Sequence, residues 1–416
     1  MRGVIAAMRS GSFLTERRVL LGASLLLVLE LLLLAIAVAA SHGAFGGVGK
    51  PSTTDFMSFY GAGRVVNAGT PALTYNHDVH WAAQQATSGA ETPYIFFYYP
   101  PVYLLLCSIL ARLPYLVAFV GFQALTLAMC LVVVRQILDK PRWSVIVPLI
   151  GFAPAVWTLG TGQNAFLTAS LFGAAMLWLE RRPVVAGLLI GALCYKPHFG
   201  LLIPFALAAG GYWRAFASAA ASAIMFCLLS VVLFGWETWA AYFRAMAGSE
   251  SVYVTGHLDF AAFITPFGTA RALTLAPKFA YAAQAVATLL AAAIVSVVWY
   301  RRVSLPIRAA VLTAATPFAI PVALMYDQVM CGIAMAWLVR AGRERGFLPW
   351  HRVILAALFV WPLFALNLDP KTYILAPPTV TVGVLALALA AARQEWRMRP
   401  AAPARLAQTA ASTTIG

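Results

Sequence analysis

Long runs of apolar residues alternate along this chain with short polar breaks. Residues 19–40 contain one ionisable side chain, that of Glu30, and residues 215–235, 279–300 and 374–392 contain none. A helix needs about 20 apolar residues to cross the hydrocarbon core of a bilayer. Because the runs lack the strict alternation of membrane β-strands, helices are the spanning structure that fits them. The pattern therefore predicts an all-α integral membrane protein.

The composition supports this prediction. The chain of 416 residues is 62% hydrophobic and only 10% charged, with a mean hydropathy of +0.82, whereas about 25% of the residues of a soluble domain are charged. A soluble domain of this size cannot hide so much apolar surface in one core. The formal net charge of +15 would indicate a nucleic-acid partner in a soluble protein. Here membrane topology explains the charge, so the expected partners include membrane lipids and no nucleic acid.

Basic residues favour the cytoplasmic loops of membrane proteins. With the N-terminal arginines placed inside, 21 of the 29 lysines and arginines fall on the same side. The first apolar run is longer than the core of a signal peptide, so we expect a retained anchor. The chain is therefore expected in the plasma (inner) membrane, with both termini in the cytoplasm. The eight basic residues that fall on the outer side are Lys50, Arg64, Arg112, Lys196, Arg244, Arg271, Lys278 and Lys371.

This orientation predicts about twelve spans within a single polytopic domain over residues 1–399. Segment 100–111 fits as an interfacial helix on the outer surface, because counting it as a span would invert every later loop. The break at Lys196-Pro197 favours broken or tilted helices. The predicted spans are residues 18–40, 115–135, 143–159, 164–180, 183–195, 199–213, 215–235, 277–299, 309–325, 328–341, 351–367 and 374–392.

Two large loops are predicted on the outer side, over residues 41–99 and 236–276. Both are expected to contain short interfacial helices. Residues 400–416 are expected to form a disordered cytoplasmic tail. The cysteines lie in apolar stretches without a metal-type spacing, so we interpret them as small core residues and not as a disulfide framework. They are Cys107, Cys130, Cys194, Cys227 and Cys331.

Polar groups concentrate on the predicted outer side, which indicates a site that faces the outer aqueous phase. Asp55 follows the first predicted span and is a candidate general base. The alternative is that it caps a helix over residues 56–68. Asp327, next to Tyr326, is either a functional carboxylate near the membrane or the cap of a helix that starts near Gln328.

Three further polar positions have two interpretations each. Lys196 could neutralise a phosphate, or it could snorkel from a helix end. The polar turn over residues 160–164 carries Gln163 and Asn164, whose amides could bind hydroxyl groups or simply turn the chain. Glu30 is expected to pair with a group on another helix or to line a hydrated cavity.

Other classes of function have little support in the sequence. His77, Asp78 and His80 form only a weak metal-type pattern, and surface solvation is the alternative. The chain contains no G-x-x-x-x-G-K-[ST], G-x-G-x-x-G or H-E-x-x-H motif, which argues against nucleotide hydrolysis, dinucleotide chemistry and zinc proteolysis. No metal and no cofactor are expected. A transporter or flippase is the main rival, but it should show repeated halves, and the sequence shows no repeat.

Several short motifs follow one another in a distinctive order. They are Asp55-Phe56, Tyr60, Ala62-Gly63-Arg64, Asn67-Ala68-Gly69 and Tyr75, then Tyr98-Tyr99-Pro100-Pro101, Gly162-Gln163-Asn164, Ala186-Gly187 through Lys196-Pro197, and Tyr326-Asp327. Together they resemble glycosyltransferase family 87, which groups enzymes that use polyprenyl-phosphate sugars. Members that transfer mannose often carry histidines near the late motif, where this chain has Met325-Tyr326-Asp327-Gln328.

The resemblance implies a GT-C architecture, in which a multi-helix membrane bundle has its site at the outer face. It implies that a hexose, mannose or a related sugar, moves from a polyprenyl-phosphate donor to a lipid or glycan acceptor with inversion and without a metal. In such families an acid of the first outer loop acts as the base, and the match falls on Asp55. Lys196 and Arg64 are then candidates for holding the leaving phosphate, and His198 and His257 are expected behind them. The remaining expected substrate-binding residues are Tyr60, Tyr99, Gln163, Asn164, Tyr326 and Asp327.

Overall fold

The computed structural model describes residues 2–40, 54–89, 92–140, 143–248, 260–365 and 376–398. Within these ranges every regular element is a helix, and the only strand-type pairing is one antiparallel bridge between Phe263 and Leu324. The predicted all-α class is confirmed. The tail predicted over residues 400–416 lies outside the described residues, and so does His257.

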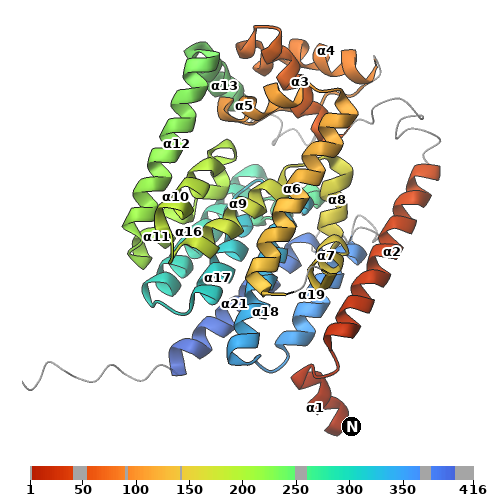
Figure 1. Ribbon diagram of the computed structural model, residues 1–416, viewed down its shortest axis with the longest axis vertical. Coiled ribbons are helices and arrows are strands. Elements are labelled where there is room, and N and C mark those ends of the chain that lie inside the picture. The colour runs from red at the N-terminus through yellow and green to blue at the C-terminus, as the bar shows by residue number, and fades with distance from the viewer. Residues whose placement is uncertain are drawn as a thin grey trace, which may run out of the picture.

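The helices form an elongated bundle with a layer of short helices at one end (Figure 1). The first half of the chain forms α1 (Arg2–Ser10), α2 (Glu16–Ala40), α3 (Asp55–Asn67), η1 (Pro71–Tyr75), α4 (His77–Ser88), α5 (Pro101–Leu110), α6 (Tyr115–Leu138), α7 (Trp143–Ile150), α8 (Ala153–Thr161), α9 (Ala165–Trp178), α10 (Pro183–Gly191), η2 (Ala192–Tyr195), η3 (Pro197–Gly200) and α11 (Ile203–Gly210). The second half forms α12 (Trp213–Phe234), α13 (Trp236–Gly248), η4 (Phe260–Ala262), α15 (Pro266–Ala272), α16 (Pro277–Tyr300), α17 (Leu305–Ala319), η5 (Met325–Gln328), α18 (Val329–Arg345), α19 (His351–Ala365) and α21 (Ala376–Met398).

Three described helices, α6, α12 and α16, are long and apolar enough to cross a membrane. A bent pair, Ser144–Ile150 with Ala153–Thr161, adds a fourth span if its two parts are counted as one. The shorter apolar helices have 10–17 residues, which corresponds to about 15–26 Å of helix against a hydrocarbon core of roughly 30 Å. The membrane character of the chain is supported, but the predicted dozen or so full-length spans are not confirmed.

The span predicted over residues 143–159 is a bent pair of helices in the structure, because the chain turns by 68° between α7 and α8. Pro148 lies inside α7 and Pro154 lies in the first turn of α8. Proline removes a backbone donor and disfavours the helical conformation of the residue before it. At the bend, a Cβ on Gly151 would lie 2.5 Å from the backbone oxygen of Ala23, so the chain packs closely on α2 at this point.

The predicted span 309–325 is also too long, since α17 ends six residues earlier. Pro317 lies inside its last turn and Pro321 follows it closely, and proline cannot continue the hydrogen bonding of a helix. The following segment pairs with another part of the chain, where the Ile264 amide donates to the Ala323 oxygen at 3.0 Å. An irregular segment therefore precedes η5.

The chain breaks at Lys196, where the sequence favoured broken helices. The α-helix α10 ends at Gly191, and the two short helices η2 and η3 flank Lys196 before α11 begins. A Cβ on Gly187 would lie 2.4 Å from the backbone oxygen of Ala215, so α10 and α12 approach each other backbone to backbone. Small residues commonly allow such close contacts between membrane helices.

A layer of short helices covers one end of the bundle (Figure 1). It contains α3, η1, α4 and α5, together with α13 from the second predicted loop. Short helices in both loops are thereby confirmed. The helix α5 has only 10 residues, too few to cross a bilayer, which agrees with the prediction for segment 100–111. It packs on α3 at Gly63, where a Cβ would lie 2.0 Å from the Cys107 oxygen.

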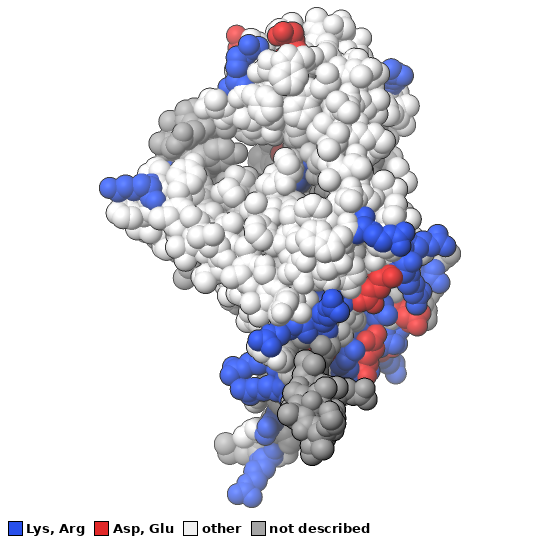
Figure 2. All heavy atoms as spheres, turned by 90° about the vertical axis from the view of Figure 1, so that its left-hand side faces the viewer, with Lys and Arg blue, Asp and Glu red and all other residues white. Residues whose placement is uncertain are grey.

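Basic residues gather at the opposite end of the molecule, beyond a broad uncharged band (Figure 2). There Lys140, which follows α6, forms an ion pair of 2.6 Å with Glu16 of α2. The Trp350 amide, before α19, donates to the Arg9 oxygen of α1 at 2.7 Å. These contacts bring α1 and the connections after α6 and α18 to one end, as the charge pattern along the sequence leads us to expect.

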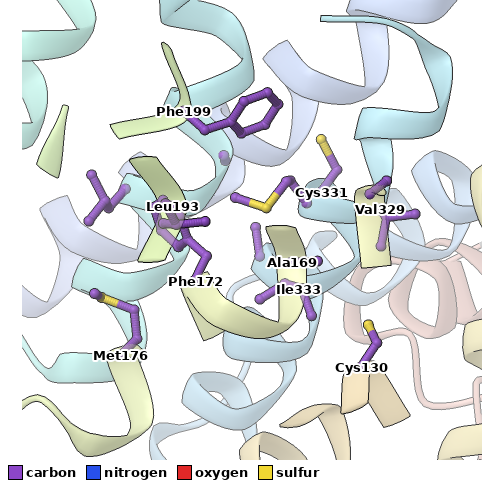
Figure 3. Close-up of a cluster of buried hydrophobic side chains, with 14 of the residues drawn as sticks. Cys130, Ala169, Phe172, Met176, Leu193, Phe199, Val329, Cys331 and Ile333 are labelled. Carbon is purple, nitrogen blue, oxygen red and sulfur yellow. The ribbon is translucent and has the colours of Figure 1, made fainter. Parts of the chain in front are cut away.

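The centre of the bundle is an apolar core with free thiols in it. Figure 3 shows its buried side chains converging from Cys130 of α6, Ala169, Phe172 and Met176 of α9, Leu193 of η2, Phe199 of η3, and Val329, Cys331 and Ile333 of α18. All five cysteines are free. The prediction that they form no disulfide framework is confirmed.

Of the two alternatives for Glu30, the structure tests only the pairing with another helix. Its residue is buried within the bundle, at 6% exposure. Neither carboxylate oxygen has a hydrogen-bond partner in the part of the chain that the structure describes. The expected pairing with another helix is therefore not found among these residues.

We expect Gly63→Ala to destabilise the protein, because the new methyl group would overlap the Cys107 carbonyl that α5 places against α3. Overpacking of this kind typically costs about 1–3 kcal/mol. The matched control is Gly121→Ala on α6, where nothing lies within 4 Å of an added Cβ. The measurement is the melting temperature of both purified variants in the same detergent. Equal melting temperatures would contradict the close α3–α5 contact.

Candidate active site

Asp55 is the first residue of α3, and Thr54 occupies the N-cap position without a side-chain capping bond. The interpretation of Asp55 as the helix cap is therefore wrong. One carboxylate oxygen of Asp55 accepts a hydrogen bond from Gln163 Nε2 at 2.8 Å. Burial raises the pKa of the Asp55 carboxyl, and the bond from Gln163 opposes that shift. The residue as a whole keeps part of its surface accessible, whereas its carboxyl group is largely buried.

The turn between α8 and α9 brings Gln163 to Asp55. Gly162 ends α8 with φ +72°, a conformation that favours glycine. A Cβ at Gly162 would lie 2.5 Å from the Cβ of Phe56, so glycine also lets the turn sit directly against the start of α3. The backbone oxygen of Gln163 accepts a hydrogen bond from Gln123 Nε2 of α6 at 3.0 Å. The turn both reverses the chain and positions an amide, so the two interpretations of this motif combine.

Lys196 and Asp327 form a buried ion pair. Their side chains lie 2.7 Å apart at 5% and 2% exposure, so the interpretation of Lys196 as a snorkelling lysine is wrong. The other carboxylate oxygen of Asp327 accepts from the Leu324 amide at 3.2 Å, which makes Asp327 a helix-capping residue and an ion-pair partner at once. Lys196 also donates to Asn164 Oδ1 at 3.5 Å, and its ammonium lies 4.5 Å from the ring centre of Phe199.

Tyr99 joins the carboxylate of Asp55 to the ion pair. Its hydroxyl donates to Gln163 Oε1 at 3.5 Å. Burial raises the pKa of the Tyr99 hydroxyl well above its ordinary value, and the negative charges of Asp327 and Asp55 raise it further. The residue is nevertheless partly accessible. A neutral tyrosine that lies near both acids makes these groups one site and not two.

Two donors in this site have no hydrogen-bond partner within the described chain, Asn164 Nδ2 and the Tyr103 hydroxyl. Both residues are buried, at 0% and 2% exposure. The ring of Tyr103 stacks on Tyr99 at 4.6 Å and on Tyr195 at 5.1 Å. The Asn164 side chain nevertheless interacts with the hydroxyls of Tyr99 and Tyr103, so these three side chains form one polar group within the site.

Sequence reasoning missed Tyr103 and Tyr195 as residues of this site. The Tyr195 hydroxyl lies 2.6 Å from Thr168 Oγ1 of α9. Their positions carried a signal, because Tyr195 precedes Lys196-Pro197 directly and Tyr103 follows the Tyr99-Pro-Pro motif closely. Aromatic residues in apolar stretches are most often core residues, and only the spatial arrangement distinguishes these two.

Two predicted site residues are not brought to this cluster. Arg64 is exposed and donates to Thr87 Oγ1 at 3.0 Å; it lies nine residues along α3 from Asp55, or about 13 Å of helix. The Tyr60 hydroxyl donates to the Leu113 backbone oxygen at 2.8 Å, so it joins α3 to the connection before α6.

The remaining predicted residues lie beside the ion pair. The ring centre of Tyr326 lies 5.6 Å from the Lys196 ammonium. His198 follows Lys196 on η3 and packs on Phe199, with ring centres 5.1 Å apart. His257 lies outside the described residues.

The histidines of α4 do not form a metal site in the structure. His80 is fully buried, its Nε2 lies 3.0 Å from the Ser58 oxygen, and its Nδ1 lies 3.3 Å from the Tyr94 hydroxyl. Burial lowers the pKa of His80 to about 4, which makes it a neutral structural residue. The His77 ring pairs with Asp78 at 2.8 Å on the surface. Across the described segments, no three His, Cys, Asp or Glu side chains come together.

The surface of the molecule is hollowed beneath the layer of short helices. Figure 2 shows this hollow, with acidic and basic atoms visible inside it and uncharged surface around it. The surface directly around the charged atoms is uncharged where it is described (Figure 2). Buried charges within apolar surroundings mark functional sites in membrane proteins.

Comparison with known proteins assigns the chain to a family. No curated protein and no solved structure matches it. The family model of glycosyltransferase family 87 matches residues 97–326, more than half of the chain. The matched segment includes Tyr99, Gln163 and Lys196, whereas Asp55 precedes it. With this match and the motif order of its sequence, the chain belongs to glycosyltransferase family 87.

Proposed function

We propose that this glycosyltransferase moves a hexose, mannose or a related sugar, from a polyprenyl-phosphate donor to a lipid or glycan acceptor. The reaction would take place at the periplasmic face of the plasma membrane, in a bundle of the GT-C type. The observation that carries the proposal is the juxtaposition of a carboxylate, Asp55, with the buried Lys196–Asp327 pair across Tyr99 and Gln163.

The base chemistry follows from the environment of Asp55. A carboxyl with a raised pKa is a stronger base than an ordinary aspartate once it has ionised. The amide of Gln163 holds one of its oxygens at 2.8 Å and leaves the other for an acceptor hydroxyl. The acceptor oxygen attacks the anomeric carbon of the donor while its proton passes to Asp55.

The leaving group requires a positive charge. As the bond between the anomeric carbon and the phosphate oxygen breaks, the electron pair stays on the phosphate. Lys196 is the cation nearest to Asp55 in the network described above, and its charge is balanced by Asp327 at 2.7 Å. A donor phosphate would enter as a second anion beside this pair, close to the polar side chains of Asn164, Tyr99 and Tyr103.

The arrangement favours a single displacement, which inverts the anomeric centre. A covalent intermediate would need a second free carboxylate close to the first. Asp327 is a poor candidate, because one of its oxygens is bound by Lys196 and the other by the Leu324 amide. Among the described residues of this network, Asp55 is the base and Asp327 is already bound, which favours direct attack by the acceptor.

The periplasmic side is supported by charge and by shape. Basic residues gather at the end opposite the short helices, and the hollow with charged atoms lies beneath those helices (Figure 2). Under the preference of basic residues for the cytoplasm, the hollow faces outward. A lipid-linked donor fits this side, because its phosphate lies at the interface while its tail remains in the bilayer.

We expect Asp55→Asn to lower the rate of sugar transfer by about 10²–10⁴, the usual contribution of a general base. The amide can still accept a bond from Gln163, and the N-cap position belongs to Thr54, so the melting temperature should change little. The measurement is transfer from a labelled polyprenyl-phosphate hexose in proteoliposomes. Asp78→Asn is the control, because that side chain is 91% exposed on α4. Transfer near the native rate by the Asp55 variant would refute its role as base.

We expect the activity to fall on the acid side of the pH–rate profile (the acid limb) at a pH above the ordinary pKa of an aspartate. The carboxyl can accept a proton only when ionised, and burial raises its pKa, so activity falls as pH drops through that raised pKa. Gln163→Ala removes the hydrogen bond that lowers this pKa, and the limb should move to still higher pH. Thr161→Ala, in the same turn but bonded only to the Trp157 oxygen, should leave the limb in place. A limb that the Gln163 variant does not move would argue that Asp55 is not the titrating group.

We expect substitutions of the Lys196–Asp327 pair to affect the stability of the protein and its rate of sugar transfer in different ways. Lys196→Met or Asp327→Asn alone leaves one charge buried without its partner, which costs about 3–5 kcal/mol. The double variant removes both charges and should regain most of the lost stability. It should still transfer sugar far more slowly than the native protein, because no cation remains for the leaving phosphate. A stable double variant with native activity would show that the pair is structural only.

A further inference from the structure

A second polar pocket lies at the basic end of the bundle. It has a volume of about 370 Å³, and its charged lining residues are Arg302, Arg308, Arg340, Arg345, Glu180 and Glu344. Its walls come from the end of α9, the α16–α17 connection and the last turns of α18. Asp327 directly precedes α18 and Arg345 ends it, so about 25 Å of helix separates this pocket from the proposed active site.

The pocket carries an excess of positive charge. Arg308 pairs with Glu180 at 2.7 Å, while Arg340 and Arg345 share Glu344 at 2.8 and 3.2 Å. Four arginines therefore face two glutamates among the lining residues. The nearby Glu395 accepts bonds from the Ser304 amide and hydroxyl at 2.7 and 2.6 Å, and it lies 3.7 Å from Arg345, so it adds a third negative charge at the rim. Four positive charges against three negative ones leave a net positive charge, which favours an anion.

Two buried donors in the lining have no partner within the described residues. They are Arg308 Nε and Trp337 Nε1, on residues that are 5% and 1% exposed. The first turn of α17, at Leu305 and Pro306, also lines the pocket, and the N-terminus of a helix attracts anions. A helix N-terminus beside an excess of arginine matches the oxygens of a phosphate group.

The surroundings indicate a lipid as the source of that phosphate. The apolar helix α16 ends at Tyr300, which is 73% exposed. Arg301 lies 4.0 Å over the ring of Trp396, which is 42% exposed. Exposed aromatic rings together with arginine are typical of the level where hydrocarbon meets water. The pocket therefore opens close to the headgroup layer.

We propose that this pocket binds the phosphate of an anionic membrane lipid in the cytoplasmic leaflet. Its arginines and the first turn of α17 bind the headgroup, and the exposed rings of α16 and α21 contact the adjoining lipid. The assignment to the cytoplasmic leaflet rests on the orientation given in the proposed function. The binding itself depends on neither the orientation nor the transfer reaction.

The test uses the full-length protein in a neutral detergent with added phosphatidylglycerol. The lipid should raise the melting temperature of the native protein and remain bound in native mass spectra. Arg340→Gln/Arg345→Gln should weaken this binding roughly tenfold or more, since each basic residue near an anionic lipid contributes about 1 kcal/mol. Arg135→Gln/Arg397→Gln is the matched control, because both arginines are exposed, are charged alike and do not line the pocket.

A second variant keeps the test decisive if the first is unstable without lipid. Arg302 lines the opposite wall and has φ +51°, a conformation that asparagine tolerates, so Arg302→Asn should lose lipid binding and keep the fold. If the pocket variants and the control variant lose lipid binding to the same extent, general attraction to the protein surface explains the binding and the proposal is overturned. If inorganic phosphate alone raises the melting temperature as much as the lipid does, the assignment to a lipid is overturned. Sugar transfer is not the readout, so failure here leaves the proposed reaction untouched.

Discussion

Burying a charge in an apolar bundle is costly unless the charge is paired, and the Lys196–Asp327 ion pair shows how that constraint shapes the fold. The two side chains lie 131 positions apart in the chain and 2.7 Å apart in space. Each comes from an irregular segment, one between η2 and η3 and the other before α18. Irregular backbone at membrane depth is tolerated only where protein or a hydrated cavity surrounds it. The pair therefore fastens two such segments to each other.

Other breaks between helices supply the remaining polar groups of the site. Asn164 at the α8–α9 turn contacts Lys196, and Gln163 beside it contacts Asp55 at the start of α3. The Asp327 carboxylate also accepts a hydrogen bond from the Leu324 backbone amide. These five residues are linked by hydrogen bonds, so the site should respond to substitution as one unit.

The sequence was most informative where one physical rule acts alone. Apolar runs predicted helices, the order of short motifs predicted the family, and the Pro-Pro start of segment 100–111 marked a helix that is too short to cross. Prolines also explain why the spans predicted over residues 143–159 and 309–325 differ from the observed helices. Pro154 and Pro321 lie where a helix bends or ends, although hydropathy alone would continue it. A hydropathy window counts proline as a neutral residue and does not detect this effect.

The contacts of the site could not be predicted in the same way. Asp55 and Gln163 are 108 positions apart, and no periodicity relates them. Arg64 and Asp55 share one motif, yet the rise of α3 separates them by about 13 Å. Whether a charge has a partner also depends on three-dimensional packing, as Glu30 and Lys196 demonstrate. Both lie in apolar surroundings, but only Lys196 has a partner among the described residues.

The short helices of this chain and its chemistry have a common origin. A regular helix satisfies its own backbone groups and offers a substrate only side chains. Here the start of α3, the α8–α9 turn, the break at Lys196 and the segment before α18 all contribute to one site. Each of these breaks shortens a helix below the length of a full span. The failure to find a dozen long helices is therefore the structural counterpart of a site that is assembled from helix ends.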